Sequence, residues 1–391
     1  MYAIAGQNNH DPSKTNIERV VEEGFTLAGP YYDYAWQGLA HVHQAAEAGL
    51  KFTYQLRAHP SLNGVGVYDR GAAIDALSDA DIADYARQQV EAVLDDPVAN
   101  ATVARWAVTP EEVRYWSDAD LRYLDITIDT IRQVEAEHGV APRPVWNYQA
   151  NARTADQLVM IGQKLDVIAR GAYMTTMEDR GPQRAGLAVW NYDQILGAAE
   201  QLGVTPQAIL QLYEDFTDPA TGTMAAEIER VIRNDMYLAL VKGITSFNVF
   251  SMFENRPNLT THNEQFEAYG SVATDLTGEL NLQRLFLAGR EQDDLEIVAT
   301  DAPQTFTYTD LFDQEHEYST LHFGNYSLDG DRYVVLVNST EATMNVSIDG
   351  LPADYMVDDL FASTSSAGTG ATYNTSLDRL GVKVLRFRTT A

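Results

Sequence analysis

Two groups of acidic residues stand where predicted strands end, and together they have the chemistry to cleave an acetal. Glu111 and Glu112 occur in the segment WAVTPEEVRYW, and Glu214 occurs in LQLYEDF. Hydrolysis of a glycosidic bond needs two carboxyl groups, one protonated to donate to the leaving oxygen and one ionised to attack the anomeric carbon or activate water. The proton donor needs a pKa raised to about 6 by burial or by a neighbouring negative charge. Glu111, Glu112 and Glu214 are therefore our candidate catalytic residues.

Amide, aromatic and charged side chains that suit sugar recognition follow the same predicted strand ends. Aromatic rings stack on the apolar faces of sugars, while amides, carboxylates and guanidinium groups bind the hydroxyls. Glu254 in SMFENR is also a reserve candidate for a catalytic carboxylate. We predict substrate contacts for Asn8, His10, Tyr31, Tyr32, Arg57, His59, Trp106, Arg114, Trp146, Asn147, Gln149, Asn151, Tyr173, Tyr213 and Glu254.

Two other functions use the same kinds of residue. In a polysaccharide lyase, a Tyr or His removes a proton beside a uronate that Arg neutralises, and Tyr31, Arg57 and His59 suit those roles. A glycan-binding barrel without activity is the other alternative. The sequence has no H-E-x-x-H motif and no H-x-H on its first strand, so we expect no metal and no cofactor.

The segment WAVTPEEVRYW also has the pattern of a helix start. Thr109 suits an N-cap, Pro110 suits the first helical position, and Glu112 lies three residues after the threonine, as in a capping box. This prediction assigns Glu112 to the helix and makes Glu111 our first choice as the acid. The field at a helix N-terminus stabilises ionised carboxylates, so burial or the charge of Glu214 would have to outweigh it.

The elements that must position these residues alternate between short apolar runs and amphipathic runs over the first 290 residues. Such alternation is typical of βα units, and eight strands with eight helices in strict order predict an α/β fold, the (β/α)8 TIM barrel. A doubly wound open sheet is the alternative, but AGQNNHDPS lacks the G-x-G-x-x-G spacing. Strands are predicted at 2–9, 25–32, 51–59, 102–108, 144–151, 166–174, 208–216 and 244–253. Helices are predicted at 15–24, 35–50, 79–96, 118–139, 154–165, 192–203, 225–243 and 264–287.

After residue 290, short alternating runs separated by turn residues replace the helical pattern. They predict a small antiparallel all-β sandwich domain over 291–391, following a catalytic barrel domain over 1–290. The segment from YVVLVNST through IDGLP and DLF to LGVKVLRF resembles the small C-terminal sandwich appended to many glycoside-hydrolase barrels.

An acidic residue after strand four and a second after strand seven is the arrangement of the clan A glycoside hydrolases, which this chain resembles. That resemblance implies retaining hydrolysis, with Glu111 or Glu112 as acid/base and Glu214 as nucleophile. In most clan A members an Asn precedes the acid, whereas here the preceding residue is Pro110 or Glu111. The choice between the two adjacent glutamates therefore stays open.

The composition limits the classes of partner that the protein is expected to bind. Asp and Glu number 56 against 27 Lys and Arg, giving a net charge of −29, which we interpret as adaptation to high salt. No basic patch indicates nucleic acid or an anionic membrane as a partner, and we expect a carbohydrate substrate. With no cysteine, disulfides and thiolate chemistry are excluded. No leader segment is seen, and a secreted or periplasmic protein whose leader has been removed is one expectation.

Overall fold

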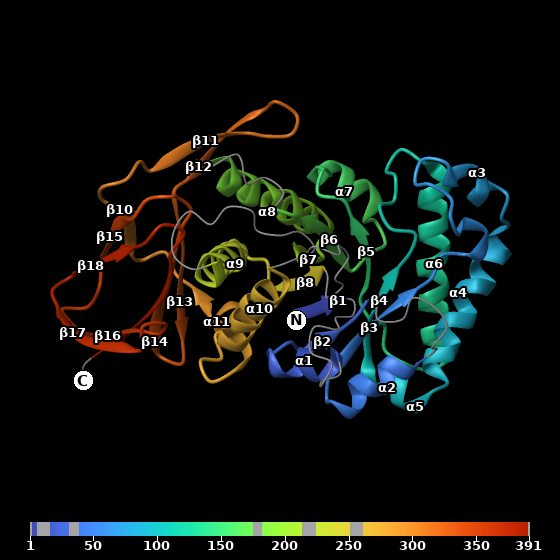
Figure 1. Ribbon diagram of the computed structural model, residues 1–391, viewed down its shortest axis with the longest axis horizontal. Coiled ribbons are helices and arrows are strands. Elements are labelled where there is room, and N and C mark those ends of the chain that lie inside the picture. The colour runs from blue at the N-terminus through green and yellow to red at the C-terminus, as the bar shows by residue number, and fades with distance from the viewer. Residues whose placement is uncertain are drawn as a thin grey trace. The chain divides into compact units, whose positions relative to one another are not determined.

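The computed structural model describes residues 2–5, 16–30, 39–174, 182–212, 224–250 and 261–389, and Figure 1 labels their elements. The chain divides into two compact units. The first comprises Met1–Tyr173, Asp193–Tyr213 and Ser246–Leu259, and the second Met174–Tyr192, Glu214–Thr245 and Thr260–Ala391. The domain boundary at residue 290 stays a prediction.

Eight parallel strands form a closed barrel in the first unit. Their order around the barrel follows the chain, and the last strand pairs with the first. The predicted (β/α)8 barrel is thereby confirmed. The strands are β1 Tyr2–Ala5, β2 Leu27–Ala28, β3 Lys51–Leu56, β4 Val103–Val108, β5 Val145–Gln149, β6 Val167–Ala172, β7 Thr205–Gln211 and β8 Ser246–Phe250.

Helices alternate with the barrel strands along the chain. The helices predicted from periodicity are α1 Asn16–Glu22, α2 Ala40–Glu47, α4 Asp79–Leu94, α6 Asp118–Glu137 and α7 Ala155–Ile161. Helix α8 Pro182–Leu202 begins ten residues before the helix predicted at 192–203. Three short helices were not predicted: η1 Pro60–Leu62, α3 Arg70–Asp75 and α5 Pro97–Thr102.

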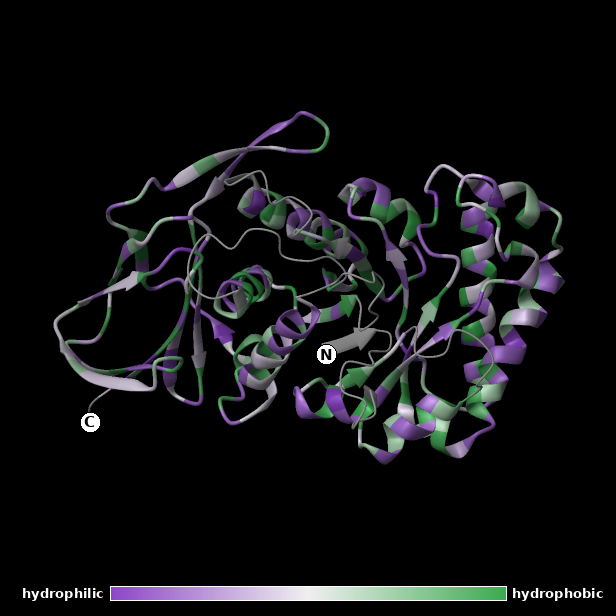
Figure 2. Ribbon diagram, viewed as in Figure 1, coloured by the Kyte–Doolittle hydropathy of each residue, from purple (hydrophilic) through white to green (hydrophobic). Residues whose placement is uncertain are grey.

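Helix α4 illustrates why these segments are helical. Ser78 and Asp81 form a capping box at its start, which satisfies backbone N–H groups that have no partner within the helix. Its buried residues include Ile82, Ala86 and Val90 at four-residue steps, so one face of the helix is apolar. Hydrophobic and hydrophilic residues accordingly alternate along α4 and α6 (Figure 2).

Side chains alternate between the barrel interior and the helix layer along each strand, because successive residues of a strand point to opposite faces. On β4, Ala107 belongs to an apolar cluster in the interior that also includes Trp146 and Ile209. The preceding residue of β4, Trp106, faces outwards, and its indole Nε1 donates a hydrogen bond of 2.8 Å to Glu135 of α6.

The second unit contains a six-stranded antiparallel sheet with the order β17-β16-β19-β14-β13-β9 and a three-stranded sheet with the order β10-β15-β18, within the described residues. Strands β11 and β12 form a separate hairpin. These sheets confirm the predicted antiparallel sandwich. The strands are β9 Arg290–Glu291, β10 Glu296–Ala299, β11 Thr305–Thr309, β12 Glu315–Ser319, β13 Leu321–Leu328, β14 Asp331–Asn338, β15 Met344–Asp349, β16 Asp354–Asp359, β17 Thr364–Thr369, β18 Thr372–Leu377 and β19 Val382–Thr389.

The same unit contains the helices α9 Met224–Val241, α10 His262–Thr277 and α11 Gln283–Ala288. Helix α9 is joined to the sandwich by polar contacts. Asn234 Nδ2 donates to the carbonyl of Asn338 at 2.8 Å, and Arg379 forms ion pairs with both Glu227 of α9 and Glu341. The helix and the sandwich therefore pack as one body.

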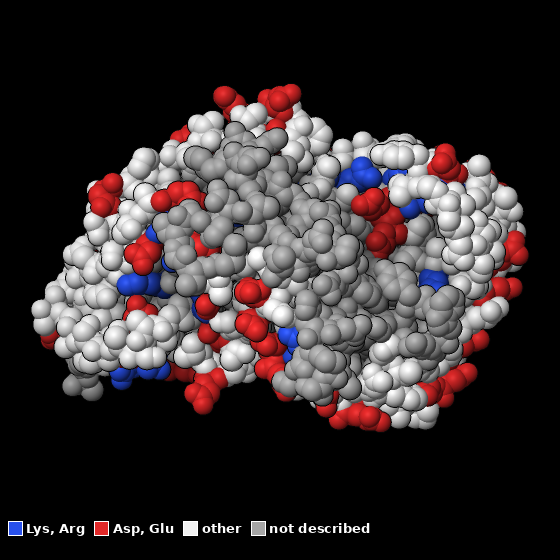
Figure 3. Space-filling model, in the orientation of Figure 1, with Lys and Arg blue, Asp and Glu red and all other residues white. Residues whose placement is uncertain are grey.

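Acidic side chains are spread across the face shown in Figure 3, whereas basic ones gather in a few places. This distribution agrees with the net charge of −29. None of the helices in the described part of the chain combines the length and the hydropathy needed to cross a membrane.

Candidate active site

The segment that follows β4 is a loop and not a helix start. The Thr109 hydroxyl donates to the carbonyl of Leu56 at 2.6 Å, and Glu112 has a φ of 53°, which is the left-handed region and not helical. Helix α6 begins only at Asp118, where Ser117 is the N-cap. The predicted capping box at Thr109 is therefore wrong, because the Thr109 side chain bonds to the end of β3. Glu111 accordingly does not lie in the first turn of a helix.

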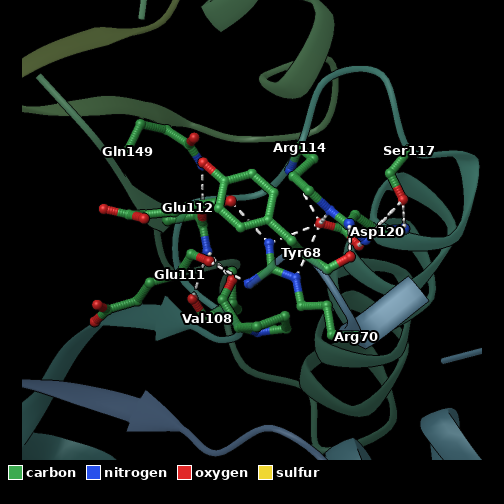
Figure 4. A network of polar contacts seen from close by, with 11 residues as sticks. Tyr68, Arg70, Val108, Glu111, Glu112, Arg114, Ser117, Asp120 and Gln149 are labelled. Atoms are coloured by element: carbon green, nitrogen blue, oxygen red, sulfur yellow. Dashed lines mark hydrogen bonds and ion pairs between the residues drawn. The ribbon is translucent and has the colours of Figure 1, made fainter. Parts of the chain in front are cut away.

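A buried cluster of one aspartate and two arginines anchors this loop (Figure 4). Asp120 has no solvent exposure. It accepts hydrogen bonds from Arg70 Nε at 3.0 Å and Nη2 at 2.7 Å, and from Arg114 Nη2 at 2.8 Å. Burial opposes the ionisation of Asp120, but the hydrogen bonds from Arg114 and Arg70 outweigh it and lower its pKa to about 2. The cluster is thus a fully ionised anchor.

Arg70 connects this anchor to the two glutamates. Its Nη1 donates to the carbonyl oxygen of Glu111 and its Nη2 to that of Glu112, both at 2.7 Å. The backbone N–H of Glu112 also donates to the carbonyl of Tyr148 on β5 at 2.9 Å. In Figure 4 the two glutamate side chains extend away from the arginine cluster. Arg70 thus holds the backbone of both glutamates, and within the described residues neither carboxyl group forms an ion pair with the arginine cluster.

Asn147 and Gln149 of β5 support the same loop. Asn147 Nδ2 donates to the carbonyls of Val108 at 2.7 Å and Pro110 at 2.9 Å, and Gln149 Nε2 donates to Asn147 Oδ1. Both side chains are buried. The sequence predicted that they contact substrate, whereas the structure places them around the backbone of the β4–α6 loop.

Glu111 lies in a pocket whose walls are mainly aromatic. The rings of Tyr148 and Tyr173 stack with their centroids 6.4 Å apart, and both come from the carboxyl ends of strands, where barrel enzymes have their active sites. The pocket has a volume of about 190 Å³ and is lined by Glu111, Trp146, Tyr148, Tyr173, Ile209, Asn248 and Phe250.

The pocket changes the acidity of Glu111. Burial, with the negative charge of Glu112, raises the pKa of Glu111 to about 8. The only hydrogen bond to its carboxylate is from Gln55 Nε2, at 3.4 Å, among the described residues. Glu111 is therefore mainly protonated at neutral pH, as a general acid must be.

We expect Glu111→Gln to stabilise the protein at pH 8 and to have little effect at pH 5. The pKa of Glu111 is raised from 4.5 to about 8 in the folded state, so between these values the unfolded chain releases a proton that the folded chain keeps. This difference destabilises the folded state increasingly as the pH rises, and Gln cannot ionise. Thermal unfolding midpoints of both proteins at the two pH values measure the effect, and an unchanged midpoint at pH 8 would contradict it.

The remaining predicted site residues do not all lie in one place. Trp146 and Tyr173 line the pocket with Glu111. Trp106 is buried between β4 and α6, with Arg143 over its ring at 5.4 Å, and Arg114 belongs to the Asp120 cluster. Outside the described residues lie Asn8, His10, Tyr31, Tyr32, Tyr213, Glu214 and Glu254.

Arg57, His59 and Asn151 follow barrel strands but do not line the pocket. The backbone N–H of Arg57 donates to Gln89 Oε1 at 2.8 Å, and the ring of His59 accepts from the N–H of Ser61 as the N-cap of η1. The carbonyl of Asn151 accepts a hydrogen bond from Arg170. No group of three or more His, Asp or Glu within the described ranges is arranged to hold a metal ion.

Sequence reasoning missed Tyr148, Asn248 and Phe250 of the pocket, and Arg70 and Asp120 behind it. The first three share a signal: Tyr148 lies two residues after Trp146, and Phe250 two after Asn248, so each pair faces one side of its strand. Arg70 gives no such signal, because it belongs to a short helix that was not predicted.

Comparison with known proteins supports both parts of the fold. Residues 320–387 match the alpha galactosidase C-terminal beta sandwich domain. A search of curated protein sequences found no match.

Three solved structures align over the whole of this chain. An alpha-amylase from Geobacillus thermoleovorans, complexed with acarbose, has a TM-score of 0.54 at 11% identity, with 98% of that chain covered. AmyP in complex with maltose has a TM-score of 0.58 at 10% identity and 97% coverage. A GH27 β-L-arabinopyranosidase from Geobacillus stearothermophilus, in complex with arabinose, has a TM-score of 0.54 at 10% identity and 97% coverage. The chain thus has the fold of barrel glycoside hydrolases that carry a C-terminal β-sandwich, as its sequence resemblance predicted.

Proposed function

We propose that this protein is a glycoside hydrolase that cleaves O-glycosidic bonds of a poly- or oligosaccharide, with Glu111 as the general acid/base. The observation that carries the proposal is a carboxyl group with a pKa of about 8 in a pocket walled by Trp146, Tyr148, Tyr173 and Phe250. Aromatic walls suit the apolar faces of sugar rings, and the barrel and sandwich are shared with enzymes whose structures contain maltose and arabinose.

In the proposed reaction, Glu111 donates its proton to the glycosidic oxygen as the bond to the anomeric carbon breaks. Glu214 attacks that carbon from the opposite face and forms a glycosyl–enzyme ester. Ionised Glu111 then takes a proton from the water that hydrolyses the ester, which completes a double displacement with retention. Glu214 lies outside the described residues, and its assignment rests on its place after strand seven. Burial first, and the charge of Glu112 second, raise the pKa of Glu111 and so keep its proton in place.

We expect activity to fall as the pH rises through about 8, because Glu111 then loses its proton. Glu112→Gln removes one cause of the raised pKa, so the alkaline limb of kcat/KM should move to lower pH, whereas Glu112→Asp should keep it nearer its original position. Profiles of kcat/KM against pH for the three proteins measure the shift. A limb at the same pH in wild type and Glu112→Gln would exclude this role of Glu112.

The experiment that tests the function is a screen on plant and marine polysaccharides at high salt, followed by NMR of the first product anomer. Retention of the anomeric configuration is expected, and it requires the two carboxyl groups to lie about 5–5.5 Å apart. Inversion, with a separation of about 6.5–9.5 Å, would instead indicate a single displacement. Full activity of Glu214→Gln would remove that residue from the mechanism.

The two alternatives predict different outcomes in the same screen. A lyase would release unsaturated products that absorb in the near ultraviolet, and a glycan-binding barrel would bind without turnover. Arg57 and His59, which suited a lyase, do not line the pocket. Hydrolysis is therefore the reaction that the described site favours.

A further inference from the structure

The interior of the barrel contains a buried arginine, Arg105 of β4, whose side chain is 3% exposed. It spans the interior, because its Nη1 donates to Gln207 Oε1 on β7 and two strands lie between β4 and β7. Its Nε donates to Thr53 Oγ1 on β3 at 2.7 Å. The positive charge therefore lies between strands and away from the surface.

No acidic side chain of the described residues forms an ion pair with Arg105. Two other buried arginines of this unit, Arg70 and Arg114, differ from it because they share Asp120. Burial lowers the pKa of Arg105 to about 9, which still leaves the guanidinium charged at neutral pH. An isolated buried charge is costly, and proteins ordinarily compensate it with an opposite charge. The partners seen here, Thr53 and Gln207, are neutral.

Hydrogen-bond donors around Arg105 also lack acceptors. Arg105 Nη2, Gln207 Nε2 and Trp146 Nε1 are buried and have no hydrogen-bond partner within the described part of the chain. The three residues are neighbours: Arg105 bonds to Gln207, and its Cζ lies 5.4 Å from the centroid of the Trp146 ring. Gln207 Oε1 is occupied, because it also accepts from Ser246 Oγ at 3.0 Å. The unmet requirement is thus for an acceptor and not for another donor.

We infer that a small monovalent anion, chloride, binds in the barrel interior and accepts hydrogen bonds from Arg105 Nη2 and Gln207 Nε2, with the indole of Trp146 as a third donor. A water molecule brings two donors of its own and no charge, whereas a halide accepts from several donors and neutralises the guanidinium. A carboxylate ligand would have to carry its organic part into a core filled with side chains. Trp146 also lines the pocket around Glu111, so the two sites share this residue, but the inference does not depend on the proposed activity.

The direct test is a crystal structure of the full chain grown or soaked with bromide in place of chloride. An anomalous peak within hydrogen-bonding distance of Arg105 Nη2 and Gln207 Nε2 is expected. A water molecule or no density at this position would overturn the inference.

A solution test uses a change that supplies the negative charge within the protein. The thermal midpoint of the wild type should rise saturably with chloride at constant ionic strength set with gluconate, because a ligand that binds only the folded state stabilises it. Gln207→Glu is nearly isosteric and places a carboxylate beside Arg105, so its midpoint should no longer depend on chloride. Arg105→Met should lose the dependence too, if it folds.

The matched control is Arg284→Gln, which removes an exposed arginine that pairs with Asp329 and should keep the chloride dependence of the wild type. An equal, unsaturated rise in the wild type and in Gln207→Glu would indicate general salt screening and would overturn the inference. The readouts are binding and stability, so the result is independent of whether a sugar substrate is found.

Discussion

Glu111→Gln is expected to lower kcat on an unactivated glycoside by about 100- to 10,000-fold, the range typical of general acid–base catalysis. The alkoxide leaving group of a sugar is poor, and its departure depends on a proton that Gln cannot supply. Glu111 is the carboxyl group in the pocket whose pKa is raised, to about 8. Steady-state kinetics on the substrate identified in the screen give the comparison.

Two comparisons separate acid catalysis from general damage to the site. Glu112→Gln changes the adjacent residue by the same chemistry, and it should retain most of its activity at pH 6, where Glu111 stays protonated. A nitrophenolate leaving group departs with little protonation. The first step of the reaction, in which the leaving group departs, should therefore be much less impaired in Glu111→Gln when the substrate is a nitrophenyl glycoside. Full activity of Glu111→Gln on the natural substrate would refute the assignment.

Arg70→Met is expected to destabilise the protein by about 3–5 kcal/mol, the range found when one partner of a buried ion pair is removed. Asp120 has no solvent exposure and would keep only Arg114 as a charged partner. The carbonyls of Glu111 and Glu112 would lose the donors that now lie at 2.7 Å. The urea concentration at the unfolding midpoint, followed by tryptophan fluorescence, reports the loss.

A double-mutant cycle that combines Arg70→Met with Asp120→Asn tests whether the loss of the buried ion pair causes the destabilisation. Removing the carboxylate as well should make the double variant more stable than the sum of the two single losses predicts, because the Arg70–Asp120 ion pair is then lost only once, although Arg114 stays behind without its carboxylate. Arg87→Met, which removes partly exposed ion pairs with Glu91 and Glu137, should cost less than about 1 kcal/mol. A similarly small loss for Arg70→Met would show that the cluster is not an anchor.

The fold could be predicted from the sequence because its signals are local. The strict alternation of apolar and amphipathic runs over the first 290 residues predicts a barrel, and the alternation after residue 290 predicts the sandwich. Helices α3 and α5 span only six residues each, which is too short for periodicity to detect.

The site could be predicted only in part, because the end of a strand gives the position of a residue but not the direction in which its side chain points. The sequence favours Glu111 as the acid and names burial or a neighbouring charge as the cause of a raised pKa, but it does not show which side chains would bury it. Asn147 and Trp146 are adjacent, yet one holds the β4–α6 loop and the other lines the pocket. Arg70 contacts Glu111 across 41 residues of sequence, a pairing that no local pattern contains.

The packing of α9 against the sandwich has a consequence for protein engineering. A truncation after residue 290 would leave Glu227 without Arg379 and Asn234 without the carbonyl of Asn338. A fragment that starts at residue 291 would expose the other half of the same contacts. Anyone who wishes to graft this sandwich onto another catalyst should therefore transfer α9 with it. The transferable module is a helix and its sheets, although the chain encodes them on either side of the last barrel strand.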